Sequence, residues 1–137
     1  MSNTFLLSII IPVFNEENNI QPLLDRLLPS VAKLNTEIIF VDDGSKDKTV
    51  PLIKQACVKN KQIKLISFYR NFGHQMALSA GYQHAKGDCV VTIDCDLQDP
   101  PEIITQMVEA WEKGSKIVYA RREKRAADSF FKRSTAT

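Results

Sequence analysis

Two aspartates separated by one residue, Asp94 and Asp96, follow an apolar run and are the first candidates for chemistry. Carboxylates at i and i+2 after a strand can converge on one hard cation. Mg²⁺ and Mn²⁺ take such oxygen ligands, often one or two carboxylates completed by phosphate oxygens. Gln98 adds a neutral oxygen two residues later. An ordinary turn is the alternative, because Asp is common in loops and Asp99 before Pro100 suits a helix cap. The position after a buried strand favours a metal site made by Asp94, Asp96 and Gln98.

A second acidic segment, residues 42–49, reads Asp-Asp-Gly-Ser-Lys-Asp-Lys-Thr and follows another apolar run. An acidic side chain there can accept a hydrogen bond from a base N–H or a ribose hydroxyl. The same segment suits a structural role, since Asp-Gly makes a turn and Asp47 can be the N-cap of the next helix. We expect Asp43, Gly44 and Asp47 to be mainly structural and Asp42 to contact a ligand.

A third segment, residues 12–17, reads Pro-Val-Phe-Asn-Glu-Glu. It is not G-x-G-x-x-G, which argues against a nicotinamide-type dinucleotide site, and the sequence has no P-loop motif. A G-x-S-x-G elbow and a His–Cys cluster are also missing, so neither a hydrolase triad nor a zinc site is supported. Asn15 and Glu16 either begin a helix or contact a nucleotide, and the sequence leaves both readings open.

Five apolar, β-branched runs must position these segments. They occupy residues 6–13, 37–41, 63–68, 89–93 and 116–120. The stretches between them repeat apolar residues at helical spacing, and Pro29 is expected to kink or end the first helix early. Near-continuous apolar strands alternating with helices predict a three-layer α/β/α fold with a mostly parallel sheet. Ligands bind at the carboxyl ends of strands in such sheets, so we expect the polar segments to meet at one edge.

Length and composition indicate one globular domain. The chain has 137 residues, of which 44% are hydrophobic and 25% charged, with a net charge of +2. These values argue against a disordered tail, a fibre or a disulfide-rich mini-protein. The near-apolar run 5–14 is too short to span a membrane, and residues 1–4 do not resemble a signal peptide. Three cysteines without metal spacing suit a reducing cytoplasm.

Basic residues concentrate in residues 121–133, while the preceding sequence is slightly acidic. A localised positive segment favours an anionic partner: phosphate, a membrane surface or nucleic acid. A solvated tail explains the same charges equally well, and no recognition motif for nucleic acid accompanies them.

The motifs in combination resemble family 2 glycosyltransferases of the GT-A fold. The matching segments are 8–17, 41–49, 70–73, Gly81 with 85–88, and 94–102. The similarity is greatest to the branch that glycosylates a polyprenyl phosphate, such as dolichyl-phosphate mannose synthase and bactoprenol glucosyltransferases. The Asp-Cys-Asp-Leu-Gln-Asp-Pro-Pro-Glu string of 94–102 and the Asp-Ser-Phe-Phe-Lys-Arg string of 128–133 carry that similarity.

The resemblance implies an inverting hexosyltransferase. It would move glucose or a related hexose from a nucleotide diphosphate sugar, UDP favoured over GDP, to a polyprenyl phosphate. It implies that Asp94 and Asp96 are catalytic and, with Gln98, hold Mg²⁺ or Mn²⁺ against the leaving diphosphate. The residues that it implies in nucleotide binding are Pro12, Val13, Asn15, Glu16, Asp42, Asp94 and Cys95. Arg122 and Arg133 match positions where an Arg meets phosphate, which its planar fork binds well.

The same resemblance implies action at the cytoplasmic face of a membrane, with residues 121–133 at the headgroup layer. It implies no nucleic-acid partner and leaves the oligomeric state open. Family members continue beyond the position of Thr137, and they usually have a small residue such as Ala where this chain has Cys95. We therefore expect residues 1–137 to form a single, truncated nucleotide-sugar-binding domain with impaired turnover.

Three other readings compete with this expectation. One is a non-catalytic nucleotide-binding module of the same fold. Another is a phosphatase of the haloacid dehalogenase type, which would place Asp-x-Asp after the first strand rather than the fourth. The third is a receiver-like domain, which would need a phosphoacceptor Asp after the third strand, where this chain has Phe68-Tyr69-Arg70.

Overall fold

The computed structural model describes residues 5–114, 117–122 and 131–136, with side chains described up to residue 114. The chain separates into two compact units, Met1–Pro101 and Glu102–Thr137. The elements of the first unit are β1 (Leu7–Val13), α1 (Ile20–Ser30), β2 (Thr36–Asp42), α2 (Thr49–Lys59), β3 (Ile63–Ser67), α3 (His74–His84) and β4 (Cys89–Thr92). The second unit contains α4 (Ile103–Glu112), β5 (Ile117–Arg122) and β6 (Phe131–Ala136). The single domain over residues 1–137 stays a prediction.

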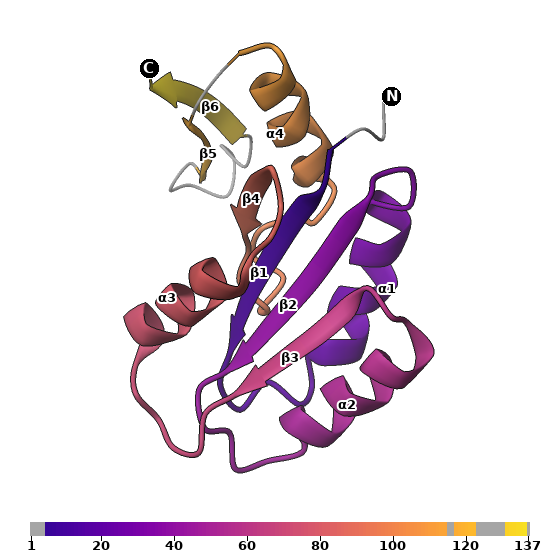
Figure 1. Cartoon of the computed structure of the whole chain (residues 1–137), viewed down its shortest axis with the longest axis vertical. Coiled ribbons are helices and arrows are strands. Elements are labelled where there is room, and N and C mark those ends of the chain that lie inside the picture. The colour runs from indigo at the N-terminus through magenta and orange to yellow at the C-terminus, as the bar shows by residue number, and fades with distance from the viewer. Residues whose placement is uncertain (1–4, 115–116, 123–130, 137) are drawn as a thin grey trace. The chain divides into compact units, whose positions relative to one another are not determined.

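A parallel sheet in the order β3-β2-β1-β4 forms the middle layer of the first unit. The two inner strands, β1 and β2, are buried along almost their whole length, as expected for strands covered on both faces. Helices α1 and α2 lie on one side of the sheet and α3 on the other (Figure 1). The predicted three-layer α/β/α architecture is therefore confirmed.

The fifth predicted strand exists, but it does not belong to the parallel sheet as expected. Residues 117–122 form β5, which pairs antiparallel with β6 in a separate two-stranded sheet instead of joining the parallel one. An antiparallel pair needs only a short connection, whereas a further parallel strand needs a crossover of a dozen residues or more. β6 itself was not predicted, because Lys132 and Arg133 conceal the apolar pattern that identified the other strands.

Two helix boundaries follow from local chemistry. Helix α1 ends at Ser30, one residue after Pro29, although apolar residues continue at helical spacing to Leu34. The early end predicted from Pro29 is thus confirmed. Asp47, however, is not the N-cap residue of α2, because Lys48 occupies that position. The Asp47 carboxylate reaches past Lys48 and accepts a hydrogen bond from the Thr49 N–H at 2.9 Å.

A buried carboxylate joins four segments near the start of the strands. Glu37 of β2, only 3% exposed, accepts hydrogen bonds from the Ser8 hydroxyl at 2.5 Å and the Lys64 ammonium at 2.8 Å. It also accepts one from the Lys86 backbone N–H at 2.6 Å. The Gly87 N–H in turn donates to the Ser8 hydroxyl at 2.8 Å. These bonds tie β1, β2 and β3 to the turn that precedes β4.

The hydrogen bonds decide the ionisation of Glu37. Burial alone would raise its pKa, but the bonds from Lys64, Ser8 and the Lys86 N–H outweigh burial. The pKa of Glu37 is therefore lowered from its usual value of 4.5. A depressed carboxyl pKa stabilises the fold above the unfolded pKa. That contribution is lost as the pH falls through the folded pKa.

We expect Glu37→Gln to lower the free energy of unfolding at pH 7 by about 1–3 kcal/mol, because one acceptor oxygen becomes a donor facing other donors. The difference from wild type should be constant above pH 4.5 and shrink below it. Urea unfolding at several pH values measures this. Asp25→Asn, at an exposed position on α1, is the control and should change stability by less than about 0.5 kcal/mol. A difference undiminished at low pH would contradict the assignment.

Candidate functional site

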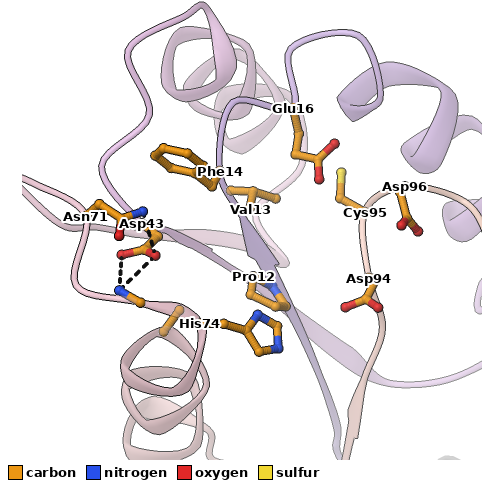
Figure 2. Close-up of a pocket in the computed structure, with 12 residues that line it drawn as sticks. Pro12, Val13, Phe14, Glu16, Asp43, Asn71, His74, Asp94, Cys95 and Asp96 are labelled. Carbon is orange, nitrogen blue, oxygen red and sulfur yellow. Dashed lines mark hydrogen bonds between the residues drawn. The ribbon is translucent and has the colours of Figure 1, made fainter.

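A pocket of about 350 Å³ lies where the strands of the first unit end (Figure 2). Its walls come from the segments after β1, β2, β3 and β4 and from the first turn of α3. The residues that line it are Pro12, Val13, Phe14, Glu16, Asp43, Asn71, Gly73, His74, Ala77, Asp94, Cys95 and Asp96. Its size suits a small-molecule ligand. The polar segments thus meet at the carboxyl edge of the sheet, as the sequence predicts.

Asn15 connects two of these walls. Its backbone N–H donates to the Ser45 hydroxyl at 2.7 Å, and its side-chain oxygen accepts from the Lys46 N–H at 2.9 Å. Its φ of 52° is the left-handed conformation that Asn tolerates better than most residues. Asn15 is not among the residues that line the pocket, and its hydrogen bonds hold the β1–α1 loop to the β2–α2 loop. Nucleotide contact by Asn15 stays a prediction.

Further hydrogen bonds join the same two loops. The Glu16 N–H donates to the Thr49 hydroxyl at 2.8 Å, and the Glu17 N–H donates to the Asp47 carboxylate at 3.2 Å. Burial alone would raise the pKa of Asp47, but donors from Thr49 and the Glu17 N–H lower it. The structural role expected for Asp47 is therefore visible, and the Glu16 side chain is left facing the pocket.

The neighbouring aspartates at the end of β2 have different environments. Asp42 is 1% exposed, and its Oδ2 accepts from the Gly44 and Ser45 N–H groups at 3.2 and 3.1 Å. Its buried Oδ1 has no hydrogen-bond partner among the described residues. Asp43, rather than Asp42, lines the pocket. Ligand contact by Asp42 stays a prediction, supported by its unsatisfied buried oxygen.

Asp43 organises the loop after β3. Its Oδ1 accepts from the Phe72 N–H at 2.7 Å, and both of its oxygens lie within 3.2 Å of the Gly73 nitrogen. The Asn71 amide donates to its Oδ2 at 3.1 Å. The expected structural role of Asp43 is thus observed. Its second role, as a wall of the pocket, was not anticipated.

Asp94, Cys95 and Asp96 form the opposite wall (Figure 2). Asp94 and Asp96 are exposed, whereas Cys95 between them is buried, so the alternation of β4 continues and gives the two carboxylates one side. The Asp96 Oδ1 accepts from the Gln98 N–H at 3.1 Å, and Leu97 has a φ of 64°. The segment therefore forms a turn and also places two carboxylates at the pocket. Gln98 does not line the pocket.

The donor atoms of this wall fit a hard divalent cation. Asp94, Asp96 and Glu16 offer carboxylate oxygens, which Mg²⁺ and Mn²⁺ prefer. Within the described ranges, however, no group of three or more His, Cys, Asp and Glu side chains is arranged to hold a metal by itself. A pair of carboxylates completed by oxygens of a ligand is a common arrangement for Mg²⁺.

Several lining residues were not predicted as site residues. They are Phe14, Asn71, Gly73, His74 and Ala77. Phe14 adjoins the predicted Pro12 and Val13, and the others come from the loop after β3 and from α3. The rule that strand-end loops meet places residues 69–74 at this edge, since they follow the third apolar run, but it does not say which of them line the pocket.

Arg122 and Arg133, predicted to meet phosphate, lie in the second unit, and their side chains are outside the described residues. The antiparallel register pairs Arg122 with Phe131 and Arg133 with Ala120, so the two arginines occupy diagonal positions of the β5–β6 pair. Among the described residues, no helix is both long enough and apolar enough to cross a bilayer.

The family model for glycosyl transferase family 2 matches residues 8–136. This chain belongs to that family. The prophage bactoprenol glucosyl transferase homolog of Escherichia coli is 42% identical to it over 95% of this chain and 43% of its own length. An uncharacterized glycosyltransferase of Bacillus subtilis, YkcC, is 45% identical over 99% of this chain. The family 2 chain thus spans less than half the length of these curated relatives.

Solved glycosyltransferases share its fold. The mannosyltransferase PcManGT of Pyrobaculum calidifontis, in complex with GDP-Man and Mn²⁺, superposes with a TM-score of 0.70 at 25% identity, over 90% of this chain and 37% of its own. Glucosyl-3-phosphoglycerate synthase of Mycobacterium tuberculosis, in complex with Mn²⁺ and UDP, gives 0.66 at 26% identity, over 84% of this chain and 42% of its own. The predicted GT-A fold of this family 2 domain is confirmed.

Cys95 allows a direct test of the pocket's electrostatics. Burial, reinforced by the negative charges of Glu16, Asp96 and Asp94, raises the pKa of its thiol to about 12. Because the thiolate is the reactive form, we expect iodoacetamide to modify Cys95 more slowly than the less buried Cys57 and Cys89. Raising the pH from about 7 to 9 should leave Cys95 largely unmodified, since the pH stays well below 12. Peptide mass spectrometry after timed labelling measures this, and equal labelling of Cys95 and Cys57 would contradict it.

Proposed function

We propose that this chain is the donor-binding part of an inverting glycosyltransferase that moves a hexose from a nucleoside diphosphate sugar to a polyprenyl phosphate, with Mg²⁺ or Mn²⁺. The carrying observation is one pocket that presents an aromatic ring and amide on one side and the Asp94–Asp96 pair on the other (Figure 2). A nucleoside and a diphosphate need those two kinds of wall. The solved relatives are complexes with GDP-Man or UDP together with Mn²⁺, which supports the donor class.

The nucleoside would occupy the side of the pocket formed by Phe14 and Asn71. Phe14 is 45% exposed and lines the pocket, so its ring is available for a base to stack on. Pro12 and Val13 give this side an apolar floor, and the unsatisfied Oδ1 of Asp42 would accept from a base N–H or a ribose hydroxyl. These groups recognise a planar, polar-edged ligand, and UDP is favoured as the nucleotide.

The diphosphate would lie toward Asp94 and Asp96. A bound Mg²⁺ or Mn²⁺ would supply Lewis-acid stabilisation of the leaving diphosphate. The two carboxylates, with Gln98 as a neutral oxygen nearby, would hold that ion and orient the donor. Cys95 contributes no charge, because its raised thiol pKa of about 12 keeps it protonated at neutral pH.

The acceptor needs little activation. A phosphate monoester has a second pKa of about 6, so its oxygen is ionised near neutral pH. That oxygen would form a bond to the anomeric carbon while the bond from this carbon to the diphosphate breaks, and the bonding electrons leave with the diphosphate. The configuration inverts, and no side chain has to take a proton from the acceptor.

The polyprenyl acceptor and a membrane surface are proposed for the second unit. The E. coli relative is named a homolog of a bactoprenol glucosyl transferase, which supports a lipid phosphate acceptor. Arg122 and Arg133 come from adjacent strands at diagonal positions and would bind phosphate. The basic segment 121–133 would meet anionic headgroups on the cytoplasmic side, at about 1 kcal/mol for each cation near the surface.

A nucleotide-binding module without transfer is the second candidate. The pocket at the strand ends accounts for nucleotide binding without requiring transfer of a sugar. Both candidates require nucleotide binding. They differ in whether sugar appears on a polyprenyl phosphate, which a radiolabelled donor reports.

We expect Mn²⁺-dependent binding of UDP or GDP that Asp96→Asn weakens at least tenfold, since even an outer-shell partner of a metal is worth about 10-fold or more. Calorimetric titration with each nucleotide, with and without Mn²⁺, measures this. Asp25→Asn removes the same charge from an exposed position on α1 and should bind like wild type. Binding that is unchanged in Asp96→Asn would refute the metal site, and no binding to the folded wild-type chain would refute the donor pocket.

For the acceptor, we expect Arg122→Ala with Arg133→Ala to weaken binding of a polyprenyl phosphate in detergent micelles by about tenfold or more, because charge-assisted hydrogen bonds are lost. The matched control is Arg121→Ala with Lys132→Ala, a directly opposed pair in the same two strands whose loss removes the same charge. Equal loss in both double variants would indicate general charge attraction instead. Polyprenol without phosphate, measured by the same titration, should bind all three proteins alike.

A further inference from the structure

The walls of the pocket are strongly acidic. Four of its lining residues carry carboxylates, namely Glu16, Asp43, Asp94 and Asp96. Among the described residues that line the pocket, His74 alone has a basic side chain. A nucleoside diphosphate brings further negative charge, and one divalent cation offsets only part of the total. A group inside this pocket that donates a hydrogen bond to an anionic oxygen would therefore favour binding of such a ligand.

His74 is held in place by its surroundings. It is the first residue of α3, and the preceding Gly73 N–H is bound by both oxygens of Asp43. One turn later, Ala77 is fully buried in the core cluster beside Ile10. The backbone of His74 is thus fixed at both ends of the first turn, so its ring is presented from a rigid support.

The ring itself is free to bind. Figure 2 shows the His74 ring pointing inward, toward Pro12. No hydrogen bond or ion pair joins the His74 side chain to any described residue. Imidazole donates an N–H in either its neutral or its protonated form, whereas the carboxylates around it can only accept when ionised.

We propose that His74 binds an anionic phosphate oxygen of the nucleotide, as the hydrogen-bond donor that complements the metal at Asp94 and Asp96. This assignment rests on the proposed nucleotide-sugar function. It makes His74 a binding residue for the diphosphate rather than for the nucleoside. The effect of removing it therefore depends on how many phosphates the ligand carries.

The second histidine of the chain provides a matched control. His84 is the last residue of the same helix, and its Nδ1 lies 2.9 Å from the Ala80 carbonyl oxygen. It does not line the pocket. His84→Ala therefore removes the same side chain from the same helix without touching the site.

The test is calorimetric titration of wild type, His74→Ala, His74→Gln and His84→Ala with a nucleoside, its monophosphate and its diphosphate in Mn²⁺. The ligands are the uridine or the guanosine series, whichever the wild-type protein binds. His74→Ala should weaken diphosphate binding about tenfold and change nucleoside binding by less than about twofold. His74→Gln keeps an N–H donor and should recover most of the loss. Thermal melts of each variant establish that all are folded.

The alternatives give different results. Equal loss for nucleoside and diphosphate in His74→Ala, or full diphosphate affinity in that variant, overturns the role of His74 while leaving the proposed function intact. If His74→Ala does not fold, His74→Gln decides, because its diphosphate affinity must still exceed that of His74→Leu. Failure of the folded wild type to bind either nucleotide overturns the proposed function and this assignment together.

Discussion

The pocket depends on the carboxylate of Asp43. Four segments that are far apart in sequence must meet at one edge, and the loop after β3 has no regular structure of its own. Asp43 fixes that loop by accepting from the Phe72 and Gly73 N–H groups and from the Asn71 amide. Gly44 permits the approach, since a Cβ there would lie 2.4 Å from the Arg70 carbonyl carbon and its φ is +82°. An acidic residue followed by glycine is thus a requirement of the loop, and α3 begins where this loop ends.

The sheet could be predicted because burial on both faces leaves a local signal. β1 and β2 are apolar at nearly every position, and this pattern identifies inner parallel strands without knowledge of their neighbours. β6 leaves no such signal. Its residues are partly basic, and what defines it is pairing with β5 across residues 123–130. Pairing is a property of two segments together, so the composition of residues 121–133 alone suggested a charged tail instead of a strand.

The sequence predicts where the site lies better than it predicts what each residue does there. The rule that ligands bind at strand ends located the Asp94–Asp96 pair and the segment after β1. It could not separate Asp42 from Asp43, because adjacent residues at a strand end point to opposite sides, and which side holds the pocket depends on the fold. His74 could not be found from motifs either. A single histidine in a sequence does not indicate a binding site. The candidate role of His74 depends on the acidic residues that the fold places around it.

Carboxylates at the two ends of the sheet have different surroundings. Near the start of the strands, Glu37 is surrounded by Lys64, the Ser8 hydroxyl and a backbone N–H, so its charge is balanced within the protein. At the other end, Asp94 is exposed to solvent, and one oxygen of the buried Asp42 has no hydrogen-bond partner among the described residues. A buried carboxylate oxygen without a hydrogen-bond partner costs free energy, whereas water solvates an exposed carboxylate. A divalent cation with a nucleotide beside it, as proposed above, would bring positive charge and hydrogen-bond donors to this edge.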